Sequence, residues 1–155
     1  MYQTRPATLD DAVTITEHRH RMFVDAGRAD NAHLRSMSDA FKPWVTEQLR
    51  NGKYFGWVTE SNGQPIASAG LMIMDWPPHP LDVQALRGYL LNVYVDPAHR
   101  RKHLASDLIE HALAEARRRK IRVIALHSTD AARPMYESNG FRRTDEMFYV
   151  EDFSG

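Results

Sequence analysis

The spacing of hydrophobic residues changes along the chain and divides it into helix-like and strand-like blocks. Residues 101–120 repeat apolar positions with a period near 3.6, which predicts a long amphipathic helix. The apolar face of this helix is formed by Leu104, Leu108, Ala112 and Leu113. Residues 87–95 and 122–127 are continuous apolar runs, typical of buried strands. We therefore predict two parallel neighbouring strands joined through the helix by a right-handed crossover.

The first third of the chain predicts one short strand and two helices. Residues 2–5 form the strand, and the Thr8–Asp11 segment resembles a capping box that opens a helix to about Val24. Residues 25–40 are polar and fit either a loop or a short helix. Residues 40–51 predict a second helix that ends at an Asn-Gly pair.

The remaining segments predict a hairpin and a C-terminal unit. Residues 54–60 and 65–74 flank a Ser-Asn-Gly turn, and a proline-rich loop follows the second of these strands. Residues 131–138 predict a short helix that tolerates Pro134 in its first turn, and residues 141–150 predict one or two final strands. Because a hairpin precedes the crossover unit, the fold class is α/β with a mixed sheet.

Composition narrows the class of protein. A chain of 155 residues is long enough for one domain with its own core, and we expect residues 1–155 to form a single domain. Lys plus Arg equals Asp plus Glu at 20 each, which disfavours a nucleic-acid or membrane-surface partner. The absence of cysteine excludes disulfides, thiolate metal sites and a cysteine nucleophile. The sequence shows no secretory signal and no long apolar run, so we expect a cytoplasmic protein.

A cluster of cations follows the strand of residues 87–95. The strand ends in Asp96-Pro97, and Arg100, Arg101 and Lys102 then precede the long helix. The first turn of a helix has unpaired backbone N–H groups and a positive dipole end, so it favours anions. The natural ligand of such a site is a pyrophosphate.

Two motifs give the chain a resemblance to a known family. The first runs from Arg100 to Ala105 after a strand ending in Val-Asp-Pro, and the second is Met135-Tyr136-Glu137-Ser138-Asn139-Gly140-Phe141. In this order and spacing they are similar to the acetyl-CoA and Leu-Tyr-Glu-x-x-Gly-Phe signatures of the GCN5-related N-acetyltransferase (GNAT) superfamily. The resemblance implies a central twisted sheet of about six or seven strands flanked by about four helices.

The resemblance also implies a mechanism and a set of site residues. The pantetheine arm of acetyl-CoA would lie against splayed strand residues and the pyrophosphate against the helix start, while Tyr136 would be the general acid for the leaving thiolate. An N–H near Val93 would polarise the thioester carbonyl. The implied cofactor-binding residues are Val93, Tyr94, Val95, Arg100, Arg101, Lys102, His103, Leu104, Ala105, Ser106, Thr129 and Tyr136.

Three positions depart from the family pattern, one of them being Pro134 inside the short helix of residues 131–138. His103 stands where the family has glycine. We expect this histidine to keep ordinary helical backbone angles, with a ring that either donates to a phosphate or crowds the cofactor. Thr129 stands seven residues before Tyr136, where many members have asparagine. The general base is not determined by the sequence, and Asp75, His79 and His20 are its candidates.

The implied reaction is acetyl transfer from acetyl-CoA to a primary amine of a small molecule, without a covalent enzyme intermediate. A peptide or protein amine, and a non-catalytic CoA-binding module, remain alternatives. The expected acceptor site lies between residues 22–40 and 75–83. Candidate carboxylates for a cationic amine are Asp25, Asp30, Asp39, Asp75 and Asp82. The spacing of the histidines predicts no metal site. The basic segment 117–122 fits a solvated helix end rather than a nucleic-acid site. A homodimer is compatible with the family.

Overall fold

The computed structural model describes residues 1–151 as a mixed α/β fold built on one sheet. Neighbouring strands follow chain order, with antiparallel pairing up to β4 and parallel pairing of β4 with β5. The strands are β1 (Tyr2–Pro6), β2 (Tyr54–Ser61), β3 (Gln64–Asp75), β4 (Leu86–Val95) and β5 (Ile124–Ala125). The predicted α/β class with a mixed sheet is therefore confirmed.

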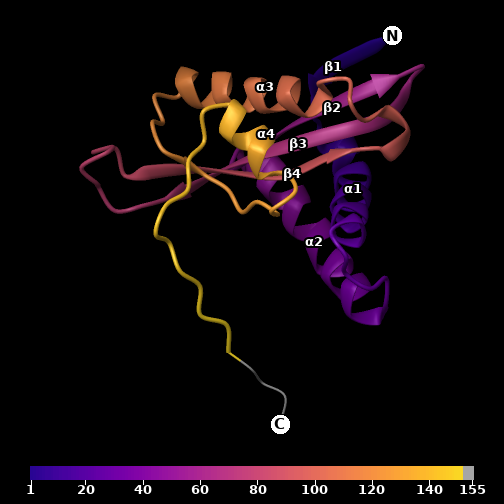
Figure 1. Ribbon diagram of the computed structural model, residues 1–155, viewed down its shortest axis with the longest axis horizontal. Coiled ribbons are helices and arrows are strands. Elements are labelled where there is room, and N and C mark those ends of the chain that lie inside the picture. The colour runs from indigo at the N-terminus through magenta and orange to yellow at the C-terminus, as the bar shows by residue number, and fades with distance from the viewer. Residues whose placement is uncertain (152–155) are drawn as a thin grey trace.

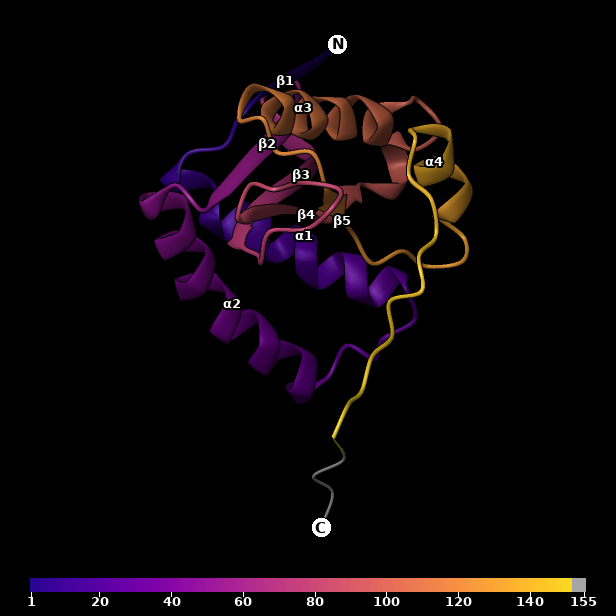
Figure 2. The same ribbon diagram turned by 90° about the vertical axis from the view of Figure 1, so that its left-hand side faces the viewer.

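Helices cover both faces of the sheet (Figures 1 and 2). One face carries α3 (Leu104–Arg118), and the other carries α1 (Ala12–Asp25) and α2 (Ala32–Asn51). The short α4 (Arg133–Ser138) lies beside the β5 end of the sheet (Figure 2). None of the helices within residues 1–151 is both long and apolar enough to cross a bilayer.

Each helical layer buries its own apolar cluster against the sheet. Leu108 and Ile109 of α3 are fully buried in the larger cluster, together with Leu71 of β3. Ile15 of α1 and Val45 of α2 are buried in the second cluster. Burying an aliphatic side chain of this size stabilises the fold by about 1.5–3 kcal/mol. Because each amphipathic helix buries its apolar face against the sheet, the structure has three layers, with helices on both sides of the sheet.

Residues 32–40 form the first half of α2, which resolves the loop-or-helix alternative for residues 25–40. The helix begins where the Asn31 side chain accepts a hydrogen bond from the Leu34 N–H at 3.1 Å. Leu34 and Phe41 then bury the inner face of α2. Asn31 is the residue in the sequence that indicates this helix start. It does not stand out there, because most of its neighbours in residues 25–40 are polar as well.

The crossover unit is shorter than predicted at two places. Helix α3 begins at Leu104 rather than at residue 101, because Arg101 and His103 have left-handed φ angles of 62° and 61°. Strand β5 contains only Ile124 and Ala125 instead of residues 122–127. The start of α3 and His127, the last residue of the predicted strand, both lie at the cavity described below.

The prediction of strands over residues 141–150 is wrong. Residues 141–151 form no strand in the described structure and run away from the sheet as an extended segment, here called the C-terminal arm (Figure 1). Its side chains Met147, Phe148, Tyr149 and Val150 are between 75% and 89% exposed. The sheet therefore has five strands rather than six or seven, and no strand within residues 1–151 covers the outer edge of β5.

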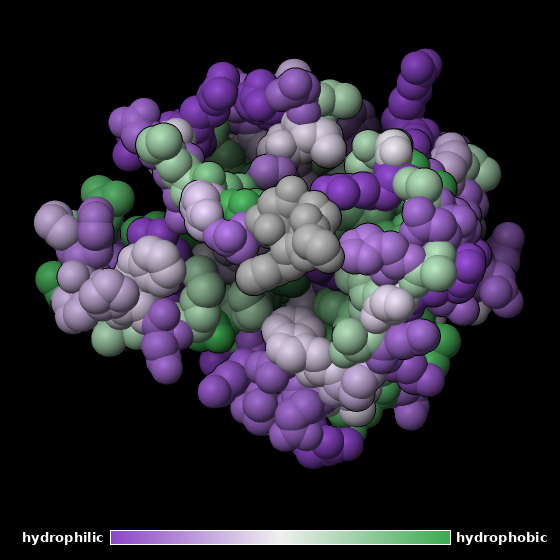
Figure 3. Space-filling model, turned by 90° about the horizontal axis from the view of Figure 1, so that it is seen from below, coloured by the Kyte–Doolittle hydropathy of each residue, from purple (hydrophilic) through white to green (hydrophobic). Residues whose placement is uncertain are grey.

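The loop between β3 and β4 also projects from the body (Figures 1 and 3). It begins at Trp76 and exposes the apolar side chains of Leu81 and Val83. Within it, His79 and Asp82 exchange backbone hydrogen bonds of 2.9 Å. The proline-rich segment thus forms the predicted loop, stiffened at its tip.

Buried His18 gives the protein a pH-dependent stability. Its Nδ1 lies 2.7 Å from the Ser68 hydroxyl. Burial, assisted by Arg21 and opposed by Asp96, lowers the pKa of His18 to about 4. The unfolded chain binds this proton below about pH 6.5 and the folded chain only below about 4, so stability falls between these values as pH decreases. We expect a loss of up to about 3 kcal/mol.

Urea unfolding at pH 7, 5.5 and 4 measures this loss. The matched variant His18→Gln retains a donor for Ser68 and does not titrate, so its profile over the same range should be flatter. Parallel profiles for the two proteins would contradict the assignment to His18.

Candidate functional site

Strands β4 and β5 separate soon after they meet. They pair only at Gly88 with Ile124 and at Tyr89 with Ala125. Strand β4 then continues to Val95 with no β5 partner in the described chain. Its backbone groups on that side are left for a ligand that presents extended hydrogen-bonding groups.

A β-bulge on β4 shapes the wall of this gap. Asn92 and Val93 together oppose Ala69 of β3, and Asn92 has a left-handed φ of 57°. The Asn92 amide donates to the Tyr54 hydroxyl at 3.0 Å and accepts from Arg19 at 2.7 Å. The buried Asn92 side chain thus fixes the bulge, and Val93 lines the gap.

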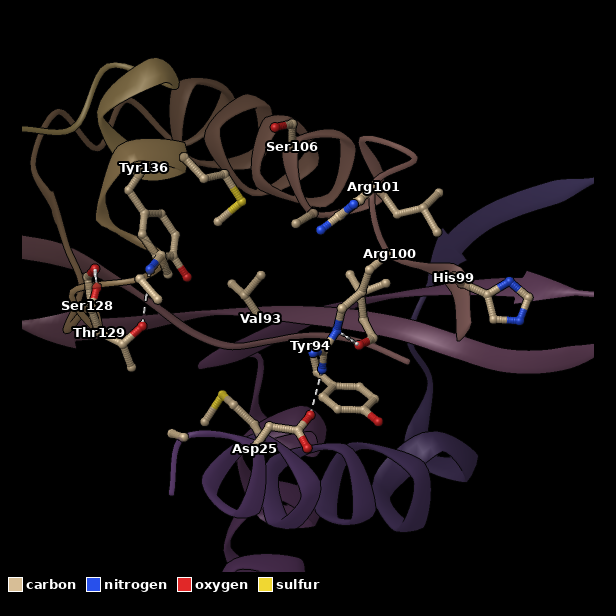
Figure 4. A pocket seen from close by; sticks show the side chains of 18 of the residues that line it. Asp25, Val93, Tyr94, His99, Arg100, Arg101, Ser106, Ser128, Thr129 and Tyr136 are labelled. Carbon is tan, nitrogen blue, oxygen red and sulfur yellow. Dashed lines mark hydrogen bonds and ion pairs between the residues drawn. The ribbon is translucent and has the colours of Figure 1, made fainter. Parts of the chain in front are cut away.

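The gap opens into a cavity of about 710 Å³ between β4, α1, α3 and α4, which is a usual size for a small-molecule site. Figure 4 shows side chains from both ends of the chain converging on it. The implied cofactor-binding residues on its wall are Val93, Tyr94, Val95, Arg100, Arg101, His103, Leu104, Ala105, Ser106, Thr129 and Tyr136. Lys102 is the exception, and its ammonium lies 6.0 Å from the centre of the Tyr2 ring.

The start of α3 presents unpaired backbone donors at one end of the cavity. Within the described chain, the N–H groups of residues 101–106 have no hydrogen-bond acceptor. The helix dipole adds partial positive charge at the same place. Arg101 contributes a full charge, whereas Arg100 is paired with Asp25 at 2.6 Å and donates to the Val95 carbonyl at 3.0 Å. This end of the cavity suits a polyanion such as a pyrophosphate.

The expectation of helical backbone angles at His103 is wrong. His103 caps α3 with φ 61° and ψ 18°, in the left-handed region that glycine adopts without steric cost. The chain thus adopts, with a histidine, a backbone conformation that favours glycine. A β-carbon in this conformation costs about 1–2 kcal/mol.

Replacing His103 with glycine is therefore expected to raise the free energy of unfolding by about 1 kcal/mol, offset in part by the greater freedom of glycine when unfolded. Thermal denaturation measures this gain, which should appear as a higher Tm. His103→Ala is the matched control, because it removes the ring but keeps the strained β-carbon. An unchanged or lower Tm in His103→Gly would contradict the strain.

The same two variants test the His103 ring. Acetyl-CoA should bind more tightly to both variants than to wild type if the ring crowds the cavity. Calorimetric titration measures the Kd values, and weaker binding by both variants would instead identify the ring as an anion ligand.

Tyr136 lies on α4 at the other end of the cavity, with its ring pointing toward Val93 (Figure 4). Burial raises the pKa of its hydroxyl to about 12, so the phenol is a proton donor throughout the neutral range. Its ring packs edge-on against Phe141. Thr129 starts this segment, and its hydroxyl accepts the Ala132 N–H at 3.2 Å. A hydrogen-bond donor thus faces the splayed strand across the cavity.

None of the candidate bases lies on the cavity wall. Asp75 ends β3, His79 accepts the Leu81 N–H within the projecting loop, and His20 is held by Ser38 and Asp30. The wall instead includes His127, which sequence reasoning missed. Its signal was its position at the end of the predicted strand of residues 122–127, because side chains where a strand passes into a loop commonly reach a site.

The sequence and fold resemble those of known acetyltransferases. The acetyltransferase (GNAT) family model matches residues 13–141. Human N-acetyltransferase 8 is 29% identical over 116 residues, which cover 73% of this chain and 48% of that protein. The chain therefore spans about half the length of this curated relative.

Two solved structures share nearly the whole fold. A GCN5-related N-acetyltransferase from Ralstonia eutropha JMP134 is 41% identical, with a TM-score of 0.92 and 100% of both chains covered. A predicted acetyltransferase with acetyl-CoA from Clostridium acetobutylicum is 28% identical, with a TM-score of 0.90, and covers 97% of this chain and 96% of its own.

Proposed function

The chain belongs to the GNAT family of acetyltransferases, and from this premise we propose that it transfers the acetyl group of acetyl-CoA to a primary amine. The observation that carries the proposal is the cavity in which unpaired N–H groups of α3, the splayed β4 backbone and Tyr136 meet. These features match the three parts of the donor, namely the pyrophosphate, the pantetheine arm and the thioester.

Within this proposal, the residues have separate roles. Residues 101–106 bind the pyrophosphate, and the backbone of β4 from Val93 to Val95 pairs with pantetheine amides. The amine nitrogen attacks the thioester carbonyl carbon, a C–N bond forms, the C–S bond breaks, and Tyr136 donates its proton to the departing sulfur. The amine proton passes to a base or to water, and His127 on the wall is the titratable group we assign to this step.

We propose a small-molecule acceptor, with a peptide or protein amine as the alternative. The acceptor would enter between α1, α2 and the β3–β4 loop. Several carboxylates expected there are already engaged, because Asp25 pairs with Arg100, Asp30 lies 3.0 Å from His20, and Asp82 accepts backbone N–H groups. Of the five candidate carboxylates, Asp39 and Asp75 thus keep side chains without a hydrogen-bond or ion-pair partner in residues 1–151.

Acetyl transfer is tested by thiol release from acetyl-CoA in the presence of an amine library, with mass spectrometry of the products. Acetylated amine formed in step with free thiol is the expected result. Saturable acetyl-CoA binding with no transfer to small amines, peptides or proteins would favour the non-catalytic CoA-binding module instead.

We also propose that the protein forms a homodimer through the C-terminal arm. The arm exposes apolar residues at positions 147–150, and the outer edge of β5 has no neighbouring strand in the described chain. An extended apolar segment and an open strand edge complement each other when two copies exchange arms. Within one chain, the Phe148 ring of the arm stacks on the His127 ring, with 5.6 Å between the two ring centres.

Light scattering after gel filtration tests this assembly. Wild type should elute at twice the chain mass of 17.8 kDa, and a Phe148→Asp, Val150→Asp double variant should elute as a monomer. Thr144→Asp changes a polar residue of the same arm and is the matched control. A monomeric wild type would contradict the arm exchange.

A further inference from the structure

Two consecutive residues of the β4 bulge face the same side of the sheet. Side chains of a regular strand alternate between the two faces. Leu91 packs against the α1 and α2 cluster, and the next residue, Asn92, also faces this layer, where it bonds to Arg19 of α1. Val93 then packs against the α3 cluster and lines the cavity (Figure 4). The orientation of the splayed part of β4 therefore depends on how Asn92 is held.

Asn92 needs partners within the protein, because its backbone conformation is costly and its side chain is polar. Its φ of 57° lies in the left-handed region, which asparagine tolerates better than most residues but which still costs free energy. The residue is only 2% exposed, so water does not satisfy its amide. Without partners, the buried amide would be unsatisfied and this conformation of the bulge would be disfavoured.

Both ends of the Asn92 amide have a partner, each from a different element. The Nδ2 group donates to the Tyr54 hydroxyl of β2 at 3.0 Å, and Oδ1 accepts from Nη1 of Arg19 at 2.7 Å. Burial raises the pKa of Tyr54 to about 12, so its hydroxyl stays neutral throughout the neutral range. The guanidinium carbon of Arg19 lies 5.0 Å from the centre of the Phe23 ring of α1 and 4.8 Å from that of Phe41 of α2. The bulge is thus fastened to β2 and to both helices of one layer.

The sheet makes room for the connection to β2 at one glycine. Strand β3 lies between β2 and β4, so the Tyr54 side chain must cross β3 to reach Asn92. A β-carbon at Gly70 would lie 2.0 Å from the Tyr54 hydroxyl oxygen, and Gly70 pairs with Leu91 directly beside the bulge. A side chain at residue 70 would therefore displace the hydroxyl from Asn92. The missing side chain is part of the path from β2 to the bulge.

We propose that Tyr54 and Arg19 are positioning residues for acetyl transfer, which act through Asn92 to hold the bulge. The bulge in turn aims the backbone of residues 93–95 at the pantetheine arm of the donor. The inference rests on the proposed function, in which this backbone pairs with pantetheine. Neither Tyr54 nor Arg19 lies on the cavity wall, so neither contacts the donor itself. Loss of either hydrogen bond lets the strand shift relative to Tyr136, and a small shift of this kind misplaces the thioester.

The experiment removes the two hydrogen bonds separately. Tyr54→Phe keeps the buried ring, and Arg19→Met keeps a flexible apolar side chain against the two aromatic rings. Each variant should raise the acetyl-CoA Kd on the order of 10-fold, as measured by calorimetric titration. Thr59→Val is the matched control, because it removes another buried hydroxyl of β2, which is bonded to Thr4 at 2.8 Å. It should leave the Kd at the wild-type value.

Variants of Asn92 separate the role of its hydrogen bonds from a general loss of packing. Asn92→Gly accepts the left-handed φ without strain and loses both bonds. In that background, Tyr54→Phe and Arg19→Met should therefore have no further effect on the Kd, because both act through Asn92. Asn92→Asp should bind acetyl-CoA nearly as well as wild type, because carboxylate oxygens accept from Arg19 and from the Tyr54 O–H.

The readouts separate this inference from the proposed function. A thermal melt of each variant establishes that it is folded at the temperature of the titration. Wild-type affinity in both single variants, further losses in the Asn92→Gly background, or an equal loss in Thr59→Val would overturn the positioning role. Failure of the wild-type protein to bind acetyl-CoA would instead contradict the proposed function itself.

Discussion

Replacing Ser106 with glutamate is expected to weaken acetyl-CoA binding on the order of 100-fold while the protein stays folded. Ser106 is the third residue of α3, counted from the cap at His103. A glutamate at this position of a helix reaches back to the N–H of the cap residue, so it fills the donors that we assign to the pyrophosphate. Its negative charge also repels the phosphates.

The same substitution does not harm the helix, because an acidic residue in the first turn interacts favourably with the helix dipole. The lost hydrogen bond from Asn139 to the Ser106 hydroxyl, 3.2 Å long, costs about 1 kcal/mol. Ser106→Gln has the same shape without the charge and should lose far less affinity. Calorimetric titration of both variants measures the effect, and equal affinities for glutamate and glutamine variants would place the phosphates elsewhere.

Replacing Tyr136 with phenylalanine should lower kcat by about 100-fold or more while the acetyl-CoA Kd stays close to that of wild type. The variant keeps the buried ring and its edge-on contact with Phe141, and removes only the hydroxyl. Without a donor, the sulfur must leave as an unprotonated thiolate. Because burial raises the pKa of the phenol to about 12, the wild-type rate should show no loss from Tyr136 ionisation below pH 10.

Steady-state thiol release measures this change, with Tyr149→Phe as the control. Tyr149 lies on the C-terminal arm, outside the cavity, with 85% of its surface exposed. Turnover of Tyr136→Phe at the wild-type rate would remove Tyr136 from the chemistry and leave the protonation to solvent.

The sequence predicted the elements in which the spacing of apolar residues determines which side is buried and so where the element packs. The long crossover helix is apolar on one face only, and β3 and β4 are apolar enough to be central strands. The family resemblance also implied a set of cofactor-binding residues, and all of them except Lys102 line the cavity. Most of these residues belong to, or directly adjoin, two motifs whose residue types and spacing can be read from the sequence.

The errors arose where a backbone conformation depends on more than residue type. His103 adopts a left-handed φ that its chemistry disfavours, since the loop geometry imposes it. The 141–150 segment has strand-like composition but has no strand partner in the described chain, and pairing is what makes a strand. The hydrogen bond from Arg19 to Asn92 could not be predicted either, because the two residues lie 73 positions apart and only the fold brings them together.

Calorimetric titration of the purified protein with acetyl-CoA determines whether the β4–α3 cavity holds the donor. We expect saturable binding of one molecule per chain, weakened by added salt because phosphates contact charged groups. Absence of binding up to millimolar acetyl-CoA would contradict it and would mean that the cavity, with His103 at its anion end, does not accept the donor.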